Sequence, residues 1–343
     1  MKKYLNTLYV MTEGAYVHKE RETVVVEIER EKKLQLPIHT IGNIFCFGHI
    51  MVSPAFMGFC GKIGIGLVFF SVYGRFLARV QGRQSGNVML RREQYRIADS
   101  EEKSVSIASA IIGAKIASSR AVLLRALRNN PYLSGKQQIK EVLEKTKKLL
   151  YTITTVTSLD LVRGLEGEAA KMYFSVFDHL ILHNKDDFSF KTRNKRPPRD
   201  KVNALLSFIY TLVTQDCVSA CEGVGLDPAV GFLHRDRPGR PGLALDFMEE
   251  FRSWLCDRLV LSLINMKQIT GYDFTVSESG AVIMNEKSRN AVVVAYQKRK
   301  QESITHPFLN EKVEIGLCFH VQAMIMARFI RRDLDFYPPF IWK

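Results

Sequence analysis

The sequence contains few cysteines, and their spacing indicates no thiolate chemistry. The 343 residues include six cysteines and no C-x-x-C pair, which argues against a disulfide scaffold and against a thiolate zinc cluster. Cys217 and Cys221 lie one helical turn apart, which alone is too little for a zinc site. We therefore expect reduced thiols in the core of a cytosolic protein.

Signals for export or membrane insertion are weak. Lys2 and Lys3 precede only a short apolar stretch that Asn6 and Thr7 interrupt, and no small-residue cleavage site follows, so we expect no signal peptide. Residues 34–61 lack charged side chains, but prolines, glycines and polar residues divide them into pieces of strand or short-helix length. We expect a buried βα segment there, and a protein of the cytoplasm without a membrane partner.

Several motifs of well-known enzyme classes are absent from the sequence. The chain has no P-loop, no G-x-G-x-x-G, no H-E-x-x-H and no G-x-S-x-G. Nucleotide hydrolysis, dinucleotide redox chemistry, zinc proteolysis and α/β-hydrolase chemistry therefore lack support.

Acidic residues are fewer than basic ones. The chain has 35 Asp and Glu against 49 Lys and Arg, a formal net charge of +14. Hydrophobic residues make up 46% and charged residues 24%, which are globular proportions and exclude wholesale disorder. This excess of positive charge favours polyanionic partners, with nucleic acid first and anionic membranes second.

The hydrophobic pattern predicts an α+β protein of two domains. In residues 1–84 short apolar runs alternate with charged turns, as in strands, and Ser53 and Pro54 are typical of the start of one small helix. Residues 85–343 read as helical, so we expect a β-rich N-terminal domain followed by a larger all-α domain. The expected helices are 105–127, 139–150, 159–182, 201–221, 243–263 and 313–334, with a small hairpin at 274–284.

One acidic residue has unusual neighbours. Glu166 lies between Gly164 and Gly167 in a helical stretch, where each glycine costs about 1 kcal/mol relative to alanine. Small residues beside an acid let a backbone, a metal ion or DNA come close. The alternative is a solvated helix acid whose glycines ease helix–helix contact.

Further candidate ligands follow in residues 231–252. His234 lies in a loop after a glycine-rich turn, and Asp246 and Glu249 open a helix at a spacing of three, which places both carboxylates on one helix face. Glu250 is expected on the other side. The alternatives are a structural loop histidine and acids that interact favourably with a helix dipole.

Taken together, these residues supply carboxylates and one imidazole. Such a set suits Mg²⁺ or Mn²⁺ better than structural Zn²⁺. A divalent ion beside a phosphodiester can activate a hydroxyl or water and stabilise the leaving oxygen. The spacing of positions 166, 234 and 246–249 does not by itself show that these side chains meet in space.

A basic segment of the chain is also consistent with a nucleic-acid partner. Residues 191–201 carry six basic side chains against one acid, and the Pro197-Pro198 pair makes the segment stiff. Contacts to phosphate would give salt-dependent affinity with little sequence preference. The alternative is an ordinary solvated run of charge. The expected DNA-binding residues are Lys191, Arg193, Lys195, Arg196 and Arg199.

Ordered sequence blocks run along nearly the whole chain. They are LPIHTIGNIFCFG (36–48), VSPAFM (52–57), GRFLARVQG (74–82), GNVMLRREQYR (86–96), RGLEGEAAKMYF (163–174), RPPRDKVNALLSFIYTLV (196–213), GLDPAVGFLH (225–234), LALDFMEEFR (243–252) and YPPFIW (337–342). Together these blocks resemble a known family, the CRISPR-associated endonuclease/integrase of spacer acquisition, the first-numbered protein of that system. The sequence of the first blocks is closest to the subtype I-C branch.

This resemblance implies a function and a set of roles. The implied activity is insertion of new spacer DNA into a CRISPR array by metal-assisted transesterification, with endonuclease activity on branched DNA. The family's metal ligands fall on Glu166, His234 and Glu249, with Asp246 as a fourth ligand or a supporting acid. Implied partners are double-stranded DNA (prespacer and repeat), a second copy of the chain held through the N-terminal domain, and a small second CRISPR-associated protein.

An alternative of a different class remains open at this stage. The chain would then be a non-catalytic DNA-binding scaffold, with the basic segment on phosphates and the acids merely capping helices. Both interpretations expect DNA affinity to fall with salt, but only an enzyme cleaves or joins DNA in a metal-dependent manner.

Overall fold

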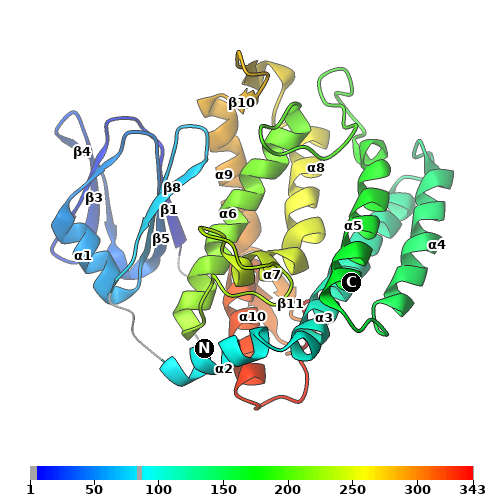
Figure 1. The fold of residues 1–343 in the computed structure, drawn as a ribbon. Coiled ribbons are helices and arrows are strands. Elements are labelled where there is room, and N and C mark those ends of the chain that lie inside the picture. Colours follow the sequence, from blue (N-terminus) through cyan, green and yellow to red (C-terminus); the bar gives the residue numbers. More distant parts are fainter. Residues whose placement is uncertain (1–5, 83–86, 343) are drawn as a thin grey trace. The chain divides into compact units, whose positions relative to one another are not determined.

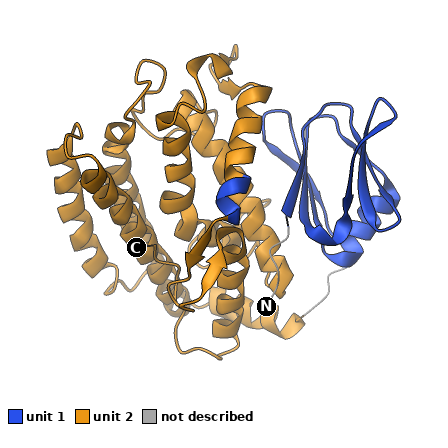
Figure 2. Cartoon of the chain, turned by 180° about the vertical axis from the view of Figure 1, so that it is seen from behind, with its two compact units in different colours: residues 1–86, 297–301 blue, residues 87–296, 302–343 orange. Residues whose placement is uncertain are grey.

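The chain folds into two compact units, shown in Figures 1 and 2. The computed structural model describes residues 6–82 and 87–342. Unit 1 comprises residues 1–86 with 297–301, and unit 2 comprises residues 87–296 with 302–343. Unit 1 is rich in strands and unit 2 is larger and helical, so the predicted fold class is confirmed.

Unit 1 contains two four-stranded sheets, in the orders β1-β5-β7-β8 and β4-β3-β2-β6. Valines and isoleucines from several strands form a shared core, for example Val17, Val24 and Ile44. The elements are β1 Asn6–Val10, β2 Tyr16–Glu20, β3 Thr23–Ile28, β4 Glu31–Pro37, β5 Ile41–Phe47, β6 Met51–Val52, α1 Pro54–Ile63, β7 Gly66–Phe70 and β8 Phe76–Val80.

Local signals in the sequence account for the helix of this unit. The Ser53 side chain accepts a hydrogen bond from the Phe56 backbone N–H, and Pro54 is the first helical residue. Residues 34–61, which lack charge, run from β4 through β5 and β6 into α1. They therefore form the expected βα segment.

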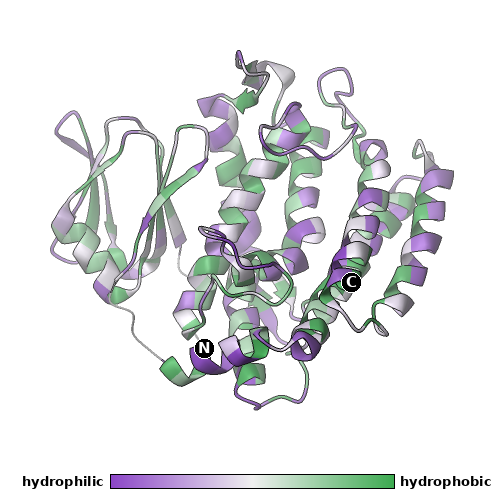
Figure 3. Cartoon of the chain, viewed as in Figure 1, coloured by the Kyte–Doolittle hydropathy of each residue, from purple (hydrophilic) through white to green (hydrophobic). Residues whose placement is uncertain are grey.

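Unit 2 is built mainly of helices with alternating hydrophobic and hydrophilic residues (Figure 3). A π-helical turn, Arg252–Asp257, divides the expected helix 243–263 into α7 and α8. The elements are α2 Val88–Ala98, α3 Glu101–Asn129, α4 Lys136–Thr152, α5 Leu159–Ser175, α6 Lys201–Val224, α7 Gly242–Phe251, α8 Arg258–Asn265, α9 Glu286–Gln301 and α10 Ile315–Ile330, with the short strands β9 Phe274–Val276, β10 Val282–Met284, β11 Ser303–Thr305 and β12 Lys312–Glu314.

Two helices of unit 2 are long and apolar enough, by length and composition, to cross a membrane. They are α3 and α6, and 56% and 78% of their most apolar windows are buried inside the structure. Core helices pass the same test, and α3 packs against α4, α5 and α7. All six cysteines are buried and free, as expected.

Candidate functional site

Three helices of unit 2 bring a buried lysine between two carboxylates. Lys115 comes from the middle of α3, Glu166 from α5 and Glu249 from α7. The Lys115 ammonium lies 2.7 Å from Glu249 Oε2 and also contacts Glu166 Oε1. Residues 115, 166 and 249, far apart in the sequence, therefore meet at one point.

Glu249 is held in its ionised form by its neighbours. Its side chain is 3% exposed, and Arg252 places Nη1 3.0 Å from Oε1. Burial by itself raises the pKa of Glu249, but Arg252, Lys115 and His234 together hold it below its usual range. Among the described residues, Oε2 is buried without a well-formed hydrogen bond, although Lys115 lies beside it.

Asp246 orients His234 and its loop rather than facing the lysine. Its buried carboxylate accepts hydrogen bonds from the backbone N–H groups of Phe232 (2.6 Å), Leu233 (3.0 Å) and His234 (3.1 Å). The same carboxylate lies 2.7 Å from His234 Nδ1. Because Nδ1 is occupied, His234 presents Nε2 as its remaining nitrogen, which is the usual arrangement of a metal-binding histidine.

Close backbone contacts fix this loop against α7. A Cβ atom on Gly231 would lie 2.7 Å from Asp246 Oδ2 and 2.6 Å from the backbone of Gly242, so only glycine fits. On the other side, Arg163 of α5 donates to the Leu233 carbonyl at 3.0 Å. The histidine is therefore connected to the helices that carry both carboxylates.

The glycines beside Glu166 leave space open. Among the described residues, a Cβ atom added to Gly164 or Gly167 meets nothing within 4 Å. The interpretation that these glycines ease helix–helix contact therefore has no support in the structure. An open surface beside a partly exposed carboxylate (28%) favours the approach of a large ligand.

Glu166, His234 and Glu249 have the donor atoms that suit a divalent cation. In this structure those atoms are farther apart than the ligands of one ion would be. Lys115 already places a positive charge between the two carboxylates, so the pair stabilises a cation at this point. Within residues 6–82 and 87–342, a group of three potential metal ligands whose donor atoms all lie within 4.8 Å of one another is found in unit 1 instead. Glu166, His234 and Glu249 do not meet that distance.

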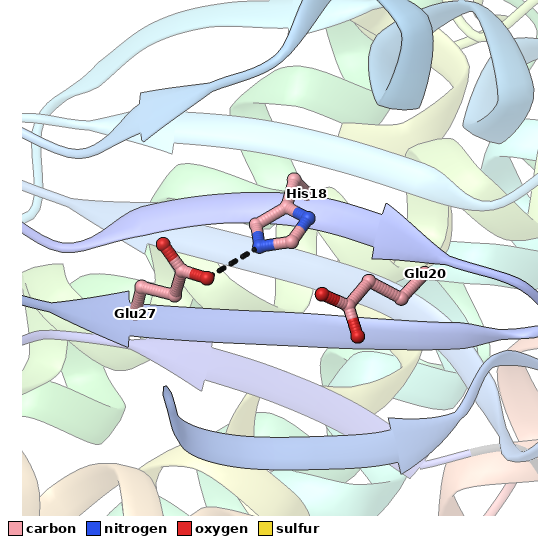
Figure 4. A group of neighbouring side chains, drawn as sticks. All are labelled: His18, Glu20 and Glu27. Atoms are coloured by element: carbon pink, nitrogen blue, oxygen red, sulfur yellow. Dashed lines mark hydrogen bonds and ion pairs between the residues drawn. The ribbon is translucent and has the colours of Figure 1, made fainter. Parts of the chain in front are cut away.

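The group in unit 1 consists of His18, Glu20 and Glu27 on β2 and β3 (Figure 4). Each of its charges already has a partner: His18 Nε2 lies 3.0 Å from Glu27 Oε1, and Lys32 lies 2.6 Å from Glu20 Oε2. The His18 ring also stacks on Tyr16. We interpret this group as ordinary cross-strand pairing.

Glu250 points away from the lysine, as the sequence predicted, and holds the end of the chain. Its buried carboxylate accepts hydrogen bonds from the Tyr337 hydroxyl (2.5 Å), the Phe340 N–H (2.7 Å) and the Gln322 side chain (2.7 Å). Residues 337–342 are therefore fixed on α7.

This arrangement predicts a pH-dependent stability. Burial raises the pKa of Glu250 from 4.5 to about 7, so the folded chain binds a proton that the unfolded chain releases. The stabilisation is complete below pH 4.5 and is lost as pH rises through 7, a decrease of about 3 kcal/mol in the free energy of unfolding. Urea titrations at pH 5 and pH 8 should show this decrease. If a Glu250→Gln variant showed the same decrease in the free energy of unfolding between pH 5 and pH 8, Glu250 would not be its cause.

The basic segment divides into two kinds of side chain. Lys191, Lys195, Arg196 and Arg199 are exposed. Arg193 instead donates to Asn203 Oδ1 at 2.6 Å and to Ser207 Oγ at 3.0 Å. Its guanidinium therefore supports the segment from inside the unit.

Two cations of the site, Arg252 and Lys115, were not predicted from the sequence. Arg252 follows Glu249 by three residues, which is the spacing of a helical ion pair. Lys115 had a signal as well, because it is a single charge within the apolar run Ile111–Ser118. A buried lysine in such a run requires a partner.

Comparisons with known proteins agree on one family. The family described as "CRISPR associated protein Cas1" matches residues 8–298. "CRISPR-associated endonuclease Cas1 1" of Chlorobaculum tepidum is 49% identical over 343 residues and "CRISPR-associated endonuclease Cas1 2" of Rhodospirillum rubrum is 48% identical over 347 residues, each with the whole of both chains covered.

Solved structures share the fold at lower identity. A CAS1 protein from Thermotoga maritima has a TM-score of 0.81 at 22% identity, with 95% of this chain and 97% of that chain covered. A casposase bound to integration product has a TM-score of 0.83 at 21% identity, covering 99% and 95%.

Proposed function

The chain belongs to the Cas1 family of CRISPR-associated proteins, and from this premise we propose that it is a metal-dependent DNA endonuclease and integrase of CRISPR adaptation. The observation that carries the proposal is the meeting of Glu166 and Glu249 on one cationic group, with His234 close enough to lower the pKa of Glu249. Carboxylates and an imidazole form a donor set that suits Mg²⁺ or Mn²⁺.

In the proposed integration, the 3′-hydroxyl of incoming DNA attacks a phosphodiester of the repeat. One P–O bond forms and one breaks, and the proton lost by the attacking hydroxyl is balanced by the proton that the departing 3′-oxygen takes up. In the endonuclease reaction water replaces the attacking hydroxyl. The ion held by Glu166, His234 and Glu249 would supply Lewis-acid stabilisation of the leaving oxygen and a lowered pKa of the nucleophile.

Residues of the chain itself prepare this chemistry. Asp246 fixes the ring of His234 through Nδ1 and three backbone N–H groups, so we assign it a positioning role rather than ligation. Arg252 adds positive charge beside the carboxylates, where a phosphate must approach.

The open space beside Glu166 gives a test of DNA approach. Gly167→Ala should raise the free energy of unfolding by about 1 kcal/mol, because alanine favours the helix and its Cβ meets no described atom within 4 Å. Strand transfer should nevertheless fall about tenfold, because the methyl group occupies space that DNA needs.

A matched control is available in unit 1. Gly58 of α1 is also an interior helix glycine whose added Cβ meets no described atom within 4 Å. Gly58→Ala should gain similar stability without loss of strand transfer. Equal activity of Gly167→Ala and wild type would show that DNA does not use this surface.

We propose that the exposed members of the basic segment contact DNA backbone. Replacing Lys195 and Arg196 together with glutamine should weaken binding to unrelated duplexes alike and reduce the salt slope by up to about 2. Fluorescence anisotropy at several salt concentrations measures both quantities. Weakening confined to one sequence would indicate base recognition instead.

The proposal extends to partners. Solved structures of the same fold include a Cas6-RT-Cas1–Cas2 complex and a TtCas1-DNA complex, which supports DNA and a small second Cas protein as partners here. Exposed Tyr73, Phe76 and Leu77 (61%, 41% and 52%) support a homodimer through unit 1. We further propose that the protein acts in the cytoplasm and belongs to the subtype I-C branch. Light scattering of the chain, alone and with the companion, tests the assembly.

The experiment that tests the activity combines a 3′-hydroxyl duplex with a plasmid carrying the repeat. Joined products should form with Mg²⁺ or Mn²⁺ and disappear with a chelator. Bound DNA without any metal-dependent cleavage or joining, in the presence of the companion protein, would favour the scaffold interpretation.

A further inference from the structure

The proposed reaction gives no role to Lys115, which lies at the centre of the site. Its side chain is 8% exposed, and its ammonium lies 2.7 Å from Glu249 Oε2 while also contacting Glu166. A lysine is almost never this buried without a partner. Here it has two carboxylate partners, and they are two of the residues that we assign to the ion.

The charges of this cluster are already balanced. Arg252 and Lys115 supply two positive charges, and Glu166 and Glu249 supply two negative ones. A divalent ion added to this set would leave an excess of positive charge in a poorly solvated place, where like charges repel strongly. One of the two side chains must therefore withdraw.

Lys115 is better able to withdraw than Arg252. The Arg252 guanidinium lies 4.8 Å from the centre of the Tyr210 ring, as well as beside Glu249. Lysine carries a compact charge on a flexible stem of four carbons. The ion and the ammonium therefore compete for the same oxygens.

An adjoining pocket offers the ammonium a second position. Lys115 lines an adjoining pocket, together with Ser253 and Asp257. Within the described part of the chain, the buried Ser253 hydroxyl has no hydrogen-bond partner. A hydroxyl and a carboxyl group on the pocket wall are acceptors that a displaced ammonium requires.

We propose that Lys115 is an internal counter-ion, which holds Glu166 and Glu249 together in the metal-free protein and competes with the divalent ion for them. This inference rests on the proposed metal site. Lys115 is then a positioning residue that keeps the site assembled before metal binding, and its competition lowers metal affinity.

Mn²⁺ titration followed by electron paramagnetic resonance tests the proposal on the intact protein. Lys115→Met removes the charge and keeps much of the stem, so the Kd for Mn²⁺ should fall at least about tenfold. The melting temperature without metal should drop by several degrees, and excess Mn²⁺ should restore it. Lys103→Met, on the exposed face of the same helix, should match wild type in both measurements.

A second variant keeps the test decisive if Lys115→Met does not fold without metal. Lys115→Arg retains the charge and can hold carboxylates through two parallel hydrogen bonds. Its Kd for Mn²⁺ should rise about tenfold. An unchanged or lower Kd would overturn the proposal, as would an unchanged Kd in a folded Lys115→Met protein.

Glu166→Gln separates this inference from the function on which it rests. If Glu166→Gln weakens Mn²⁺ binding while Lys115→Met leaves it unchanged, the metal site stands and the counter-ion role is wrong. If Glu166→Gln leaves Mn²⁺ binding unchanged, both the metal site and the counter-ion role are wrong.

Discussion

Glu166→Gln should reduce metal-dependent strand transfer at least about 100-fold, the size expected when one charged group that stabilises the transition state is removed. Glutamine keeps the shape of the side chain but removes the charge that we assign to the ion. Glu166 is 28% exposed, so the fold should tolerate the change. DNA affinity, measured without metal, should remain close to wild type.

The control for this prediction lies two residues further along the same helix. Glu168 is exposed on α5, and the structure gives it no place in the cluster with Lys115. Glu168→Gln should transfer strands at the wild-type rate. If Glu166→Gln lost no more activity than Glu168→Gln, Glu166 would have no role in the reaction.

Asp246→Asn should produce the second large loss. The Asp246 carboxylate accepts from three backbone N–H groups and lies beside His234 Nδ1. An asparagine amide turns one of these acceptors into a donor, so the ring loses its fixed orientation. We expect Mn²⁺ affinity to fall about 10–100-fold, as for other residues that orient a metal ligand.

A double-mutant comparison distinguishes positioning from direct ligation by Asp246. If Asp246 acts through the imidazole, then Asp246→Asn should cost little more Mn²⁺ affinity in a His234→Ala background. Additive losses in the two backgrounds would indicate that Asp246 contributes to metal binding by itself. Melting temperatures measured beside each titration exclude simple unfolding.

Local structure was predictable where short-range chemistry determines it. Ser53 caps α1 as its sequence position suggested. Asp200 caps α6, and Gly225 ends α6 with a left-handed backbone. The hairpin at 274–284 also forms, as β9 and β10. In each case the signal and the structure lie within a few residues of one another.

Elements that depend on distant contacts were harder to predict. The polar helix α2 is capped by Asn87 and is held by Gln94, which donates to the carbonyls of Asp227 and Val230. The π-helical turn that divides the expected helix 243–263 contains no proline that would predict it. Asn87 is a local signal for the start of α2, but nothing within either segment reveals the contacts of Gln94 or the π-helical turn.

The same limit applies to the site. The sequence indicated Glu166, His234 and Glu249 as separate candidates. His234 and Asp246, which contact each other, are also close in the sequence. Lys115 lies 51 residues before Glu166, so their ion pair depends on how α3 packs against α5. Likewise, the sequence predicted Arg193 as a DNA-binding residue of the basic segment, but Asn203 and Ser207 bind it from α6.

The central claim is that one hard cation is held jointly by residues of α5, of the loop after α6 and of α7. Anomalous scattering from a crystal of the protein soaked in Mn²⁺ tests it most directly. We predict a single strong peak within ligation distance of Glu166, Glu249 and His234 Nε2, with the Lys115 ammonium moved away from it. A peak at His18, Glu20 and Glu27 of unit 1, with none beside Glu166, would contradict the account.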